Sequence, residues 1–355
     1  MDFSAKIIDW YKVHKRDLPW RNTNNPYLVW LSEIILQQTR VNQGLNYYLT
    51  FKKEFPSLQK FAMAKEDKIL KCWEGLGYYS RARNMHHTAK HIVKHCKGRF
   101  PEKYNELIRL KGIGPYTAAA IASFCFNEPF AVVDGNVIRV LSRYLGINQS
   151  FYSATGKKEF EKVAALLLNK SNPAIHNQAI MEFGALQCIP QNPSCHQCIL
   201  NETCYALKNN KVKELPLRKE KKESKTKYFN YIIIHNKNKV FIHQRTGKGI
   251  WENLYEFPLI EENKKWTSEM QLLGKIKQRF KTDTVSLLNH PIEITHILSH
   301  QRIKIKFYHV QLSDYSFMKK NYELVNTNML KEYALPIVIR KYINSISIFG
   351  EKKII

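Results

Sequence analysis

Long apolar runs and acidic residues are both scarce in this chain of 355 residues. No stretch approaches the roughly 18 consecutive apolar residues that a membrane-spanning helix needs, which excludes an integral membrane protein. The N-terminal segment, MDFSAKIIDWYKVHKRDLPW, contains no apolar signal core. We therefore expect a cytoplasmic protein of bacterial type with no membrane partner.

The shortage of acidic residues leaves a large excess of positive charge. The 56 Lys and Arg outnumber the 30 Asp and Glu, so the formal net charge is +26. Such a field attracts polyanions, with nucleic acid as the first partner to consider and an anionic membrane surface as the second. Because 42 of the basic residues are lysine, the compositional bias of an AT-rich genome explains the charge equally well.

The chain is too long for a domain that depends on disulfides, and it has only seven cysteines. Four of them share a short loop with the spacing C-x6-C-x2-C-x5-C, namely Cys188, Cys195, Cys198 and Cys204. Four thiolates on one loop can converge on a single metal centre. From the spacing alone an iron–sulfur cluster is favoured, while a zinc site and coincidence stay open.

Two regions of different periodicity follow each other along the chain. Apolar residues recur at helical spacing up to about residue 205, which predicts helices over 27–48, 104–110, 118–126, 136–145 and 157–168. Residues 208–227 are basic and poor in apolar residues, as in a linker. Beyond them, β-branched runs at 228–235, 239–244 and 302–310 accompany a helical pattern at 266–280, so the last third is expected to be an α+β domain.

A Gly-x-Gly turn lies between two predicted helices, in the string Leu110-Lys-Gly112-Ile113-Gly114-Pro-Tyr116. Glycines let a backbone approach a ligand closely, and the free N–H groups at the start of the second helix suit a phosphate. Taken alone, the turn is equally consistent with a simple connection between helices.

The hairpin, the segment Val133-Asp134-Gly-Asn136 and the cysteine loop occur in an order that resembles the helix-hairpin-helix DNA glycosylase superfamily, in its endonuclease III branch. This resemblance resolves the metal choice towards a [4Fe-4S] cluster. It implies an all-α helix-hairpin-helix glycosylase at the start of a multidomain chain, and the α+β region that follows resembles a smaller Nudix-like (MutT-like) domain. The expected divisions are an iron–sulfur subdomain of residues 1–28 and 127–205, a six-helix barrel of 29–126, a linker of 206–227 and a C-terminal domain of 228–350.

Within that branch the chain resembles the MutY family of adenine DNA glycosylases over almost its whole length. A Glu with a following Gln-Gln-Thr is not expected in endonuclease III, and this contrast decides between the two. The strings that carry the resemblance are Leu18-Pro-Trp-Arg21, Trp30-Leu-Ser-Glu33 running on to Gln37-Gln38-Thr39-Arg40, Trp73-Glu-Gly75-Leu76-Gly77-Tyr78-Tyr79 and Val133-Asp134-Gly-Asn136.

Two carboxylates are expected to carry the chemistry, because adenine is a poor leaving group and its bond to deoxyribose breaks only with help. The base must be protonated and an oxocarbenium-like sugar must be stabilised. By resemblance, Glu33 protonates adenine and must be desolvated enough to hold a proton near neutral pH, and Asp134 stabilises the sugar. Tyr116 assists, and Asn136 is the neighbour of Asp134. Without the motifs, Glu33 reads equally as a surface residue in a charge pair and Asp134 as a helix N-cap.

The residue at position 116 also separates two enzyme classes. Bifunctional members of the superfamily have a Lys there, which forms a Schiff base and cleaves the strand. The Tyr116 of this chain therefore implies a monofunctional glycosylase without strong lyase activity.

The resemblance further implies that the target base is flipped out of the duplex. The residues expected to contact DNA are Arg21, Gln38, Thr39, Leu76, Tyr78, Gly112 and Gly114, with Gln38 and Tyr78 entering the base stack. The C-terminal domain lacks the REx2EE core of active Nudix hydrolases, so we expect it to bind and not to cut. Its implied ligand is 8-oxoguanine, contacted by Ser299 and His300 beside Leu298, where the family commonly has Phe.

The expected function is base excision repair by removal of adenine mispaired with 8-oxoguanine or guanine in double-stranded DNA, by a monomer with a [4Fe-4S] cluster that works at the nucleoid. Two alternatives stay open at this point. One is an oxidised-pyrimidine glycosylase and lyase like endonuclease III, and the other is an iron–sulfur DNA-binding protein that has lost catalysis.

Overall fold

The computed structural model describes residues 2–217, 225–264, 268–298 and 301–346. The chain forms two compact units. One contains Met1–Met63 and Asn84–Glu220, and the other contains Ala64–Arg83 and Lys221–Ile355. Among the described residues, no helix is long and apolar enough to cross a membrane.

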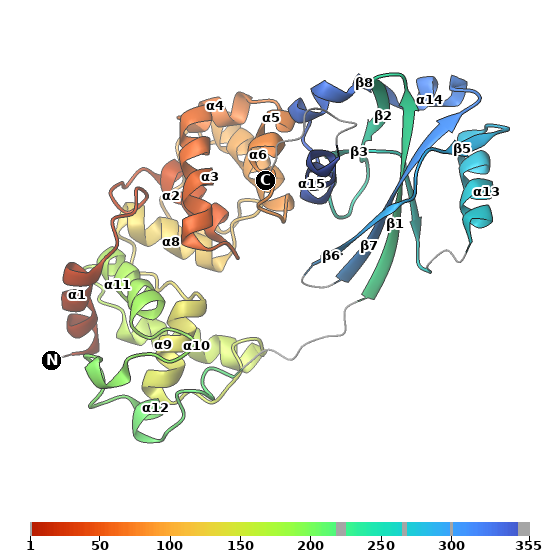
Figure 1. Cartoon of the computed structure of the whole chain (residues 1–355). Helices are drawn as coiled ribbons and strands as arrows, with labels where there is room; N and C mark the ends of the chain where they lie inside the picture. Colours follow the sequence, from red (N-terminus) through yellow and green to blue (C-terminus); the bar gives the residue numbers. More distant parts are fainter. Residues whose placement is uncertain (1, 218–224, 265–267, 299–300, 347–355) are drawn as a thin grey trace. The chain divides into compact units, whose positions relative to one another are not determined.

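The first unit is helical, as the periodicity predicts (Figure 1). Local signals set its helix starts: Asn25, Asp134 and Ser153 each cap the helix that follows by accepting from a backbone N–H. Its helices are α1 (Phe3–His14), α2 (Pro26–Leu36), α3 (Val41–Glu54), α4 (Leu58–Met63), most of α6 (Ser80–His95), α7 (Tyr104–Leu107), α8 (Pro115–Phe126), α9 (Gly135–Leu145), α10 (Ala154–Leu167), α11 (Pro173–Leu186), the short 3-10 turn η1 (Cys195–Gln197) and α12 (Tyr205–Lys208).

The single helix predicted over 27–48 is wrong, because the structure divides it into α2 and α3. The break falls at residues 37–40, where Gln38 adopts a left-handed conformation with φ of 55°. A non-glycine residue in this region ends a helix at a cost in energy. The break turns the end of α2 and the residues after it towards the cleft described below.

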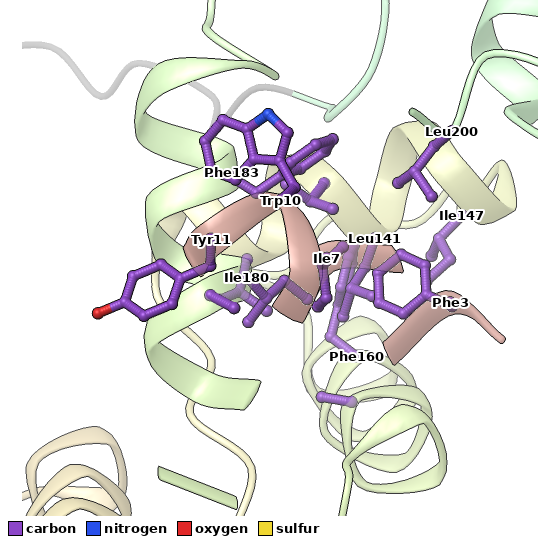
Figure 2. Packing of buried hydrophobic residues seen from close by; sticks show 14 residues of the cluster. Phe3, Ile7, Trp10, Tyr11, Leu141, Ile147, Phe160, Ile180, Phe183 and Leu200 are labelled. Carbon is purple, nitrogen blue, oxygen red and sulfur yellow. The ribbon is translucent and has the colours of Figure 1, made fainter. Parts of the chain in front are cut away.

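A hydrophobic cluster holds α1 against the later helices α9, α10 and α11 (Figure 2). Phe3, Ile7 and Trp10 supply the side of α1, and they meet Leu141 of α9 and Phe183 of α11. Each fully buried side chain of this size contributes about 1.5–3 kcal/mol relative to exposure. The N-terminal helix is thereby packed onto the part of the chain that carries Asp134 and the cysteine loop.

The second unit is built on a mixed sheet with the strand order β3-β2-β1-β7-β5 (Figure 1). Its centre is a parallel pair in which Lys225–Ile234 of β1 align with Gln301–Val310 of β7, and β6 pairs antiparallel with the start of β7. Both strands are rich in buried Ile, Phe and Tyr, as expected of a strand covered on two faces. The elements are α5 (Glu66–Cys72), β1 (Lys225–Asn236), β2 (Lys239–Gln244), β3 (Tyr255–Glu256), β4 (Leu259–Glu262), α13 (Glu269–Phe280), β5 (Val285–Leu287), β6 (Ile292–Ile297), β7 (Gln301–Leu312), α14 (Ser316–Asn321), β8 (Glu323–Asn326), η2 (Thr327–Glu332) and α15 (Ile337–Ser345).

Candidate active site

A cleft of about 780 Å³ opens in the helical unit. It is lined by residues 16–21, the end of α2 with the residues that follow it, and the first turns of α8 and α9 together with α11. Glu33, Tyr116, Asp134 and Asn136 all face it, and Gln38 and Thr39 lie on its lining. The tertiary fold thus gathers four sequence segments that carry predicted site residues.

Glu33 lies on the buried face of α2, with only 6% of its surface exposed. The hydroxyl of Tyr116, in the first turn of α8, donates to Glu33 Oε2 at 2.6 Å. Burial raises the pKa of Glu33 to about 7; the Tyr116 hydrogen bond lowers it and the nearby Asp134 raises it. A carboxyl group with this pKa carries a proton for much of the time at neutral pH, which suits a general acid.

Asp134 caps α9, as its position before a helix suggests. Its Oδ1 accepts from the Val137 amide at 2.8 Å, and its Oδ2 accepts from Asn136 Nδ2 at 2.7 Å. Burial raises the pKa of Asp134, while these hydrogen bonds oppose that shift by favouring the carboxylate. The capping role and a role in the cleft are therefore compatible, because one oxygen serves the helix and the other is held by Asn136.

A hydrogen-bonded chain runs from Asp134 towards the cysteine loop. Arg139, one turn along α9, donates to Asn136 Oδ1 at 2.9 Å and to the carbonyl of Cys188 at 2.7 Å. The same guanidinium also donates to the carbonyl of Gly184 on α11. A Cβ at Gly184 would lie 2.7 Å from Asn136 Cβ, so the glycine is what allows α11 this close to the first turn of α9. Asn136 is therefore held by its hydrogen bonds to Asp134 and Arg139 and by its close approach to Gly184.

Glu182 of α11 is a cleft residue that the sequence analysis missed. Only 1% of its side chain is exposed, and it accepts bidentate hydrogen bonds from both Arg16 and Arg21. Burial alone raises the pKa of Glu182, but the bonds from Arg21 and Arg16 outweigh it and lower the pKa to about 2. Arg21, expected above to contact DNA, is thus committed to a buried ion pair. An acidic residue within the apolar segment Ala179–Leu186 was the signal available in the sequence.

Removing the charge of Glu182 is expected to destabilise the fold. A Glu182→Gln substitution leaves two guanidinium groups without their counterion, and breaking a buried ion pair in this way costs about 3–5 kcal/mol. We expect the lower end, about 3 kcal/mol, because one third of the Arg16 side chain is exposed. Urea unfolding at neutral pH measures this; a loss below about 1 kcal/mol would contradict it.

The glycine turn predicted to hold phosphate has the expected shape. Gly112 has φ of 80°, and a Cβ there would lie 2.7 Å from Asn84 Cβ. Gly114 is the N-cap of α8, and both glycines are exposed. Thr88 of α6 donates to the Lys111 carbonyl at 2.6 Å and so holds the turn in place. The turn presents backbone at the start of a helix, where an anion is favoured.

The loop that contains Leu76 and Tyr78 belongs to the second unit. Leu76 is buried, whereas 45% of Tyr78 is exposed. Tyr78 has a left-handed backbone with φ of 46°, and Gly75 and Gly77 have φ of 97° and 73°. Gln38 shares this strained conformation, so both residues expected to enter the base stack lie at strained positions, which are common at functional sites.

The four loop cysteines line a single cavity of about 30 Å³. None of them is in a disulfide. Arg143 donates to Cys188 Sγ at 3.5 Å and to the carbonyl of Ile189 at 2.7 Å, which ties the loop to α9. Across the described part of the chain, no three Cys, His or carboxylate side chains form a set that could hold a single metal ion.

The two residues predicted to contact 8-oxoguanine, Ser299 and His300, lie outside the described residues. His296, on the strand before them, lies with its ring 5.6 Å from that of Trp251. Burial lowers the pKa of His296, so this ring is neutral at physiological pH.

Comparison with known proteins gives the family. Residues 31–168 match the HhH-GPD superfamily of base excision DNA repair proteins, and residues 230–345 match the NUDIX domain. The adenine DNA glycosylase of Buchnera aphidicola subsp. Baizongia pistaciae is 37% identical over 357 aligned positions, which cover 98% of this chain and 97% of that protein. The chain belongs to the adenine DNA glycosylase family.

Solved structures of other DNA glycosylases share the fold of the helical part of this chain. A thermostable thymine-DNA glycosylase superposes with a TM-score of 0.54 at 27% identity, covering 58% of this chain and 95% of that one. An endonuclease III bound to DNA superposes with a TM-score of 0.51 at 21% identity, covering 58% and 94%. The predicted fold class, a helix-hairpin-helix glycosylase followed by a Nudix-like domain, is confirmed.

The enzyme class follows from family membership. An adenine DNA glycosylase is a hydrolase of N-glycosyl bonds that acts in base excision repair. The cleft brings together two carboxyl groups, Glu33 and Asp134, and carboxyl groups are the residue type that such hydrolysis uses.

Proposed function

We propose that this adenine glycosylase removes adenine paired with 8-oxoguanine, and also adenine paired with guanine, from double-stranded DNA. The observation that carries the proposal is Glu33, a buried carboxyl with a pKa near 7 that is hydrogen-bonded to Tyr116 and lies near Asp134 in one cleft. One carboxyl group that can donate a proton and a second that can stabilise a developing sugar cation are what cleavage of a glycosidic bond uses.

In the proposed reaction Glu33 acts as the general acid. Its Oε2 accepts from Tyr116, so Oε1 is the oxygen that carries the transferable proton to N7 of a flipped adenine. Protonation makes the base a better leaving group as the bond to deoxyribose lengthens. Tyr116 fixes the orientation of the carboxyl group, and burial keeps the proton on it.

Asp134 then stabilises the positive charge that develops on the sugar. Asn136 and the Val137 amide hold the carboxylate in a fixed direction, so little reorganisation is needed as charge develops. Water attacks the sugar to complete the hydrolysis. Because position 116 holds Tyr and not Lys, no amine at this position forms a Schiff base, which favours a monofunctional glycosylase over the endonuclease III alternative.

The pH dependence of adenine release should report the protonation of Glu33. Since the acid form is active, the single-turnover rate should fall as the pH rises above about 7, approaching a tenfold loss per pH unit. Tyr116→Phe removes a hydrogen bond that lowers the pKa of Glu33, so the alkaline limb should move to higher pH. A rate that is flat from pH 6 to 9 would contradict the assignment of Glu33 as the acid.

The flipped adenine leaves a gap in the duplex that side chains must fill, at a cost of a few kcal/mol in lost stacking and pairing. We assign this to Gln38 and Tyr78, with Leu76 and Thr39 as further contacts to DNA. The exposed backbone at Gly112 and Gly114 would hold a phosphate. The net charge of +26 would supply the non-specific attraction to the backbone.

The residues of the cysteine loop fit a [4Fe-4S] cluster. Four sulfurs line one cavity. Zinc ribbons usually use two C-x2-C knuckles and this loop has one, so the cysteine spacing favours a polynuclear centre. Cys188, Cys195, Cys198 and Cys204 would hold it, and when bound it would cross-link the loop. Iron and sulfide analysis of protein purified without oxygen tests this; zinc in place of iron would overturn it.

The C-terminal domain would read the opposite base, with Ser299 and His300 contacting 8-oxoguanine. Adenine release from duplexes that pair A with 8-oxoguanine, G or C tests the whole proposal. We expect the fastest release opposite 8-oxoguanine, slower release opposite G and little opposite C. No release from the first duplex by protein with its cluster would overturn the proposed function.

A further inference from the structure

The segment Ala64–Arg83 is separated in sequence from the C-terminal domain by more than a hundred residues, yet both belong to one compact unit. This segment contains the loop Gly75–Tyr79, which we name the probe loop because Tyr78 is its exposed side chain. Polar contacts at several points hold the segment to the C-terminal domain.

The first contact is a bidentate ion pair directly before the probe loop. Arg340 of α15 donates from Nε to Glu74 Oε1 at 2.6 Å and from a terminal nitrogen to Glu74 Oε2 at 3.2 Å. The two side chains are only 13% and 11% exposed. The same guanidinium donates to the carbonyls of Leu330 and Tyr333, so its position is fixed before it meets Glu74. A planar, bidentate and largely buried pair of this kind specifies geometry as well as energy.

The other contacts hold the two ends of the segment. Arg83 donates to both the carbonyl and the carboxylate of Glu252, at 2.8 and 2.7 Å. At the other end, Asn253 Nδ2 donates to Glu66 Oε1 at 2.6 Å. Glu252 and Asn253 are adjacent, so one turn of the C-terminal domain binds both ends of the segment Ala64–Arg83.

Internal contacts make the probe loop a defined shape between these anchors. Trp73 Nε1 donates to the Gly77 carbonyl at 3.0 Å, and Arg81 donates to the carbonyls of Leu76 and Gly77. The Arg81 guanidinium also lies over the rings of Trp73 and Tyr78, at 5.0 and 5.9 Å. Movement of Glu74 would therefore be passed on to Tyr78 through a short, connected set of contacts.

We propose that Glu74 and Arg340 are positioning residues that tie the probe loop to the domain that reads the opposite base, so that engagement of 8-oxoguanine and placement of Tyr78 occur together. This inference rests on the proposed function. It makes the C-terminal domain more than a separate reader, because binding of the opposite base by this domain would also place the loop that fills the gap left by adenine. On an A:G duplex the C-terminal domain gains less binding energy from the opposite base. The contact between Glu74 and Arg340 then contributes less to the rate of adenine release.

The first test measures, in the absence of DNA, whether the contact between Glu74 and Arg340 holds the probe loop in place. Hydrogen exchange of the amides of residues 75–81 is compared in the wild type, in Arg340→Met and in the isosteric Glu74→Gln. We expect exchange in the loop to accelerate by about tenfold in Arg340→Met and by less in Glu74→Gln. Glu262→Gln is the matched control, because it breaks a carboxylate pair with Lys275 elsewhere in the same domain and should leave the loop unchanged. Thermal melts of all variants establish that each one is folded.

The second test is a double-mutant cycle on activity. Arg340→Met should lower the ratio of single-turnover rates on A:8-oxoguanine and A:G by about tenfold, and should change nothing further in a Tyr78→Ala background. A purely structural role for Arg340 predicts additive losses on both duplexes.

The outcomes separate the inference from the function on which it rests. Unchanged exchange in the loop, or additive effects in the cycle, overturns the tie even if the wild type is active. A wild type that releases no adenine from A:8-oxoguanine overturns the proposed function, while the exchange measurement still decides whether Arg340 holds the loop. Accelerated exchange together with a non-additive cycle supports the tie.

Discussion

Glu33→Gln is expected to lower the single-turnover rate of adenine release by about 10²–10⁴-fold, because a positioned general acid contributes this much. Gln keeps the size of the side chain and can still accept from Tyr116, so the fold and the cleft should survive. The measurement is release of adenine from an A:8-oxoguanine duplex by excess enzyme, with duplex affinity measured in parallel to show that binding is retained.

The matched control is Glu128→Gln, another carboxylate of the helical unit. Its Oε2 accepts from the Tyr104 amide at 2.7 Å, and it does not line the cleft. Its rate should remain within about twofold of the wild type. Equal activity of the wild type and Glu33→Gln would favour the catalytically silent alternative if both are inert, and would remove Glu33 from the mechanism if both are active.

Asp134→Asn is expected to lower the same rate by about 10²–10³-fold, the usual loss when a group that stabilises transition-state charge is removed. The substitution separates the two roles of this residue. Asn is as good an N-cap as Asp, so α9 should keep its start while the cleft loses a negative charge that faces the sugar.

Ser153→Ala is the control for the capping role, because Ser153 caps α10 by accepting from the Gly156 amide at 3.0 Å. It should reduce the free energy of unfolding by about 1 kcal/mol and leave the rate of adenine release unchanged. If Asp134→Asn keeps both the stability and the rate of adenine release of the wild type, Asp134 is a cap and nothing more.

Much of the architecture was predictable because its signals are local. The change from helical spacing to β-branched runs marks the Nudix-like domain, and the strands at 228–235, 239–244 and 302–310 fall within β1, β2 and β7. The break at Gln38 was not predictable, since the residues around it keep a helical apolar pattern. Gln38 adopts a left-handed conformation there, which the apolar periodicity does not report.

In the candidate site, too, some features could be predicted from the sequence and others only from the fold. Glu33 and Asp134 could be singled out from short motifs, and the cysteine loop from its spacing. The ion pair of Glu182 could not be predicted, because its partners Arg16 and Arg21 lie 166 and 161 residues away. No periodicity in the sequence reports which distant residue will supply the counterion of a buried acid.

The sequence by itself determined the family, the order of the domains and the kind of chemistry, because motifs and spacing are properties of neighbouring residues. The tertiary structure alone decided that the pKa of Glu33 lies near 7, since it depends on burial and on Tyr116 and Asp134, which are distant in the sequence. It also decided that residues 64–83 join the C-terminal domain through Glu74 and Arg340. Both results come from contacts between distant segments, which chain packing creates and local sequence does not encode.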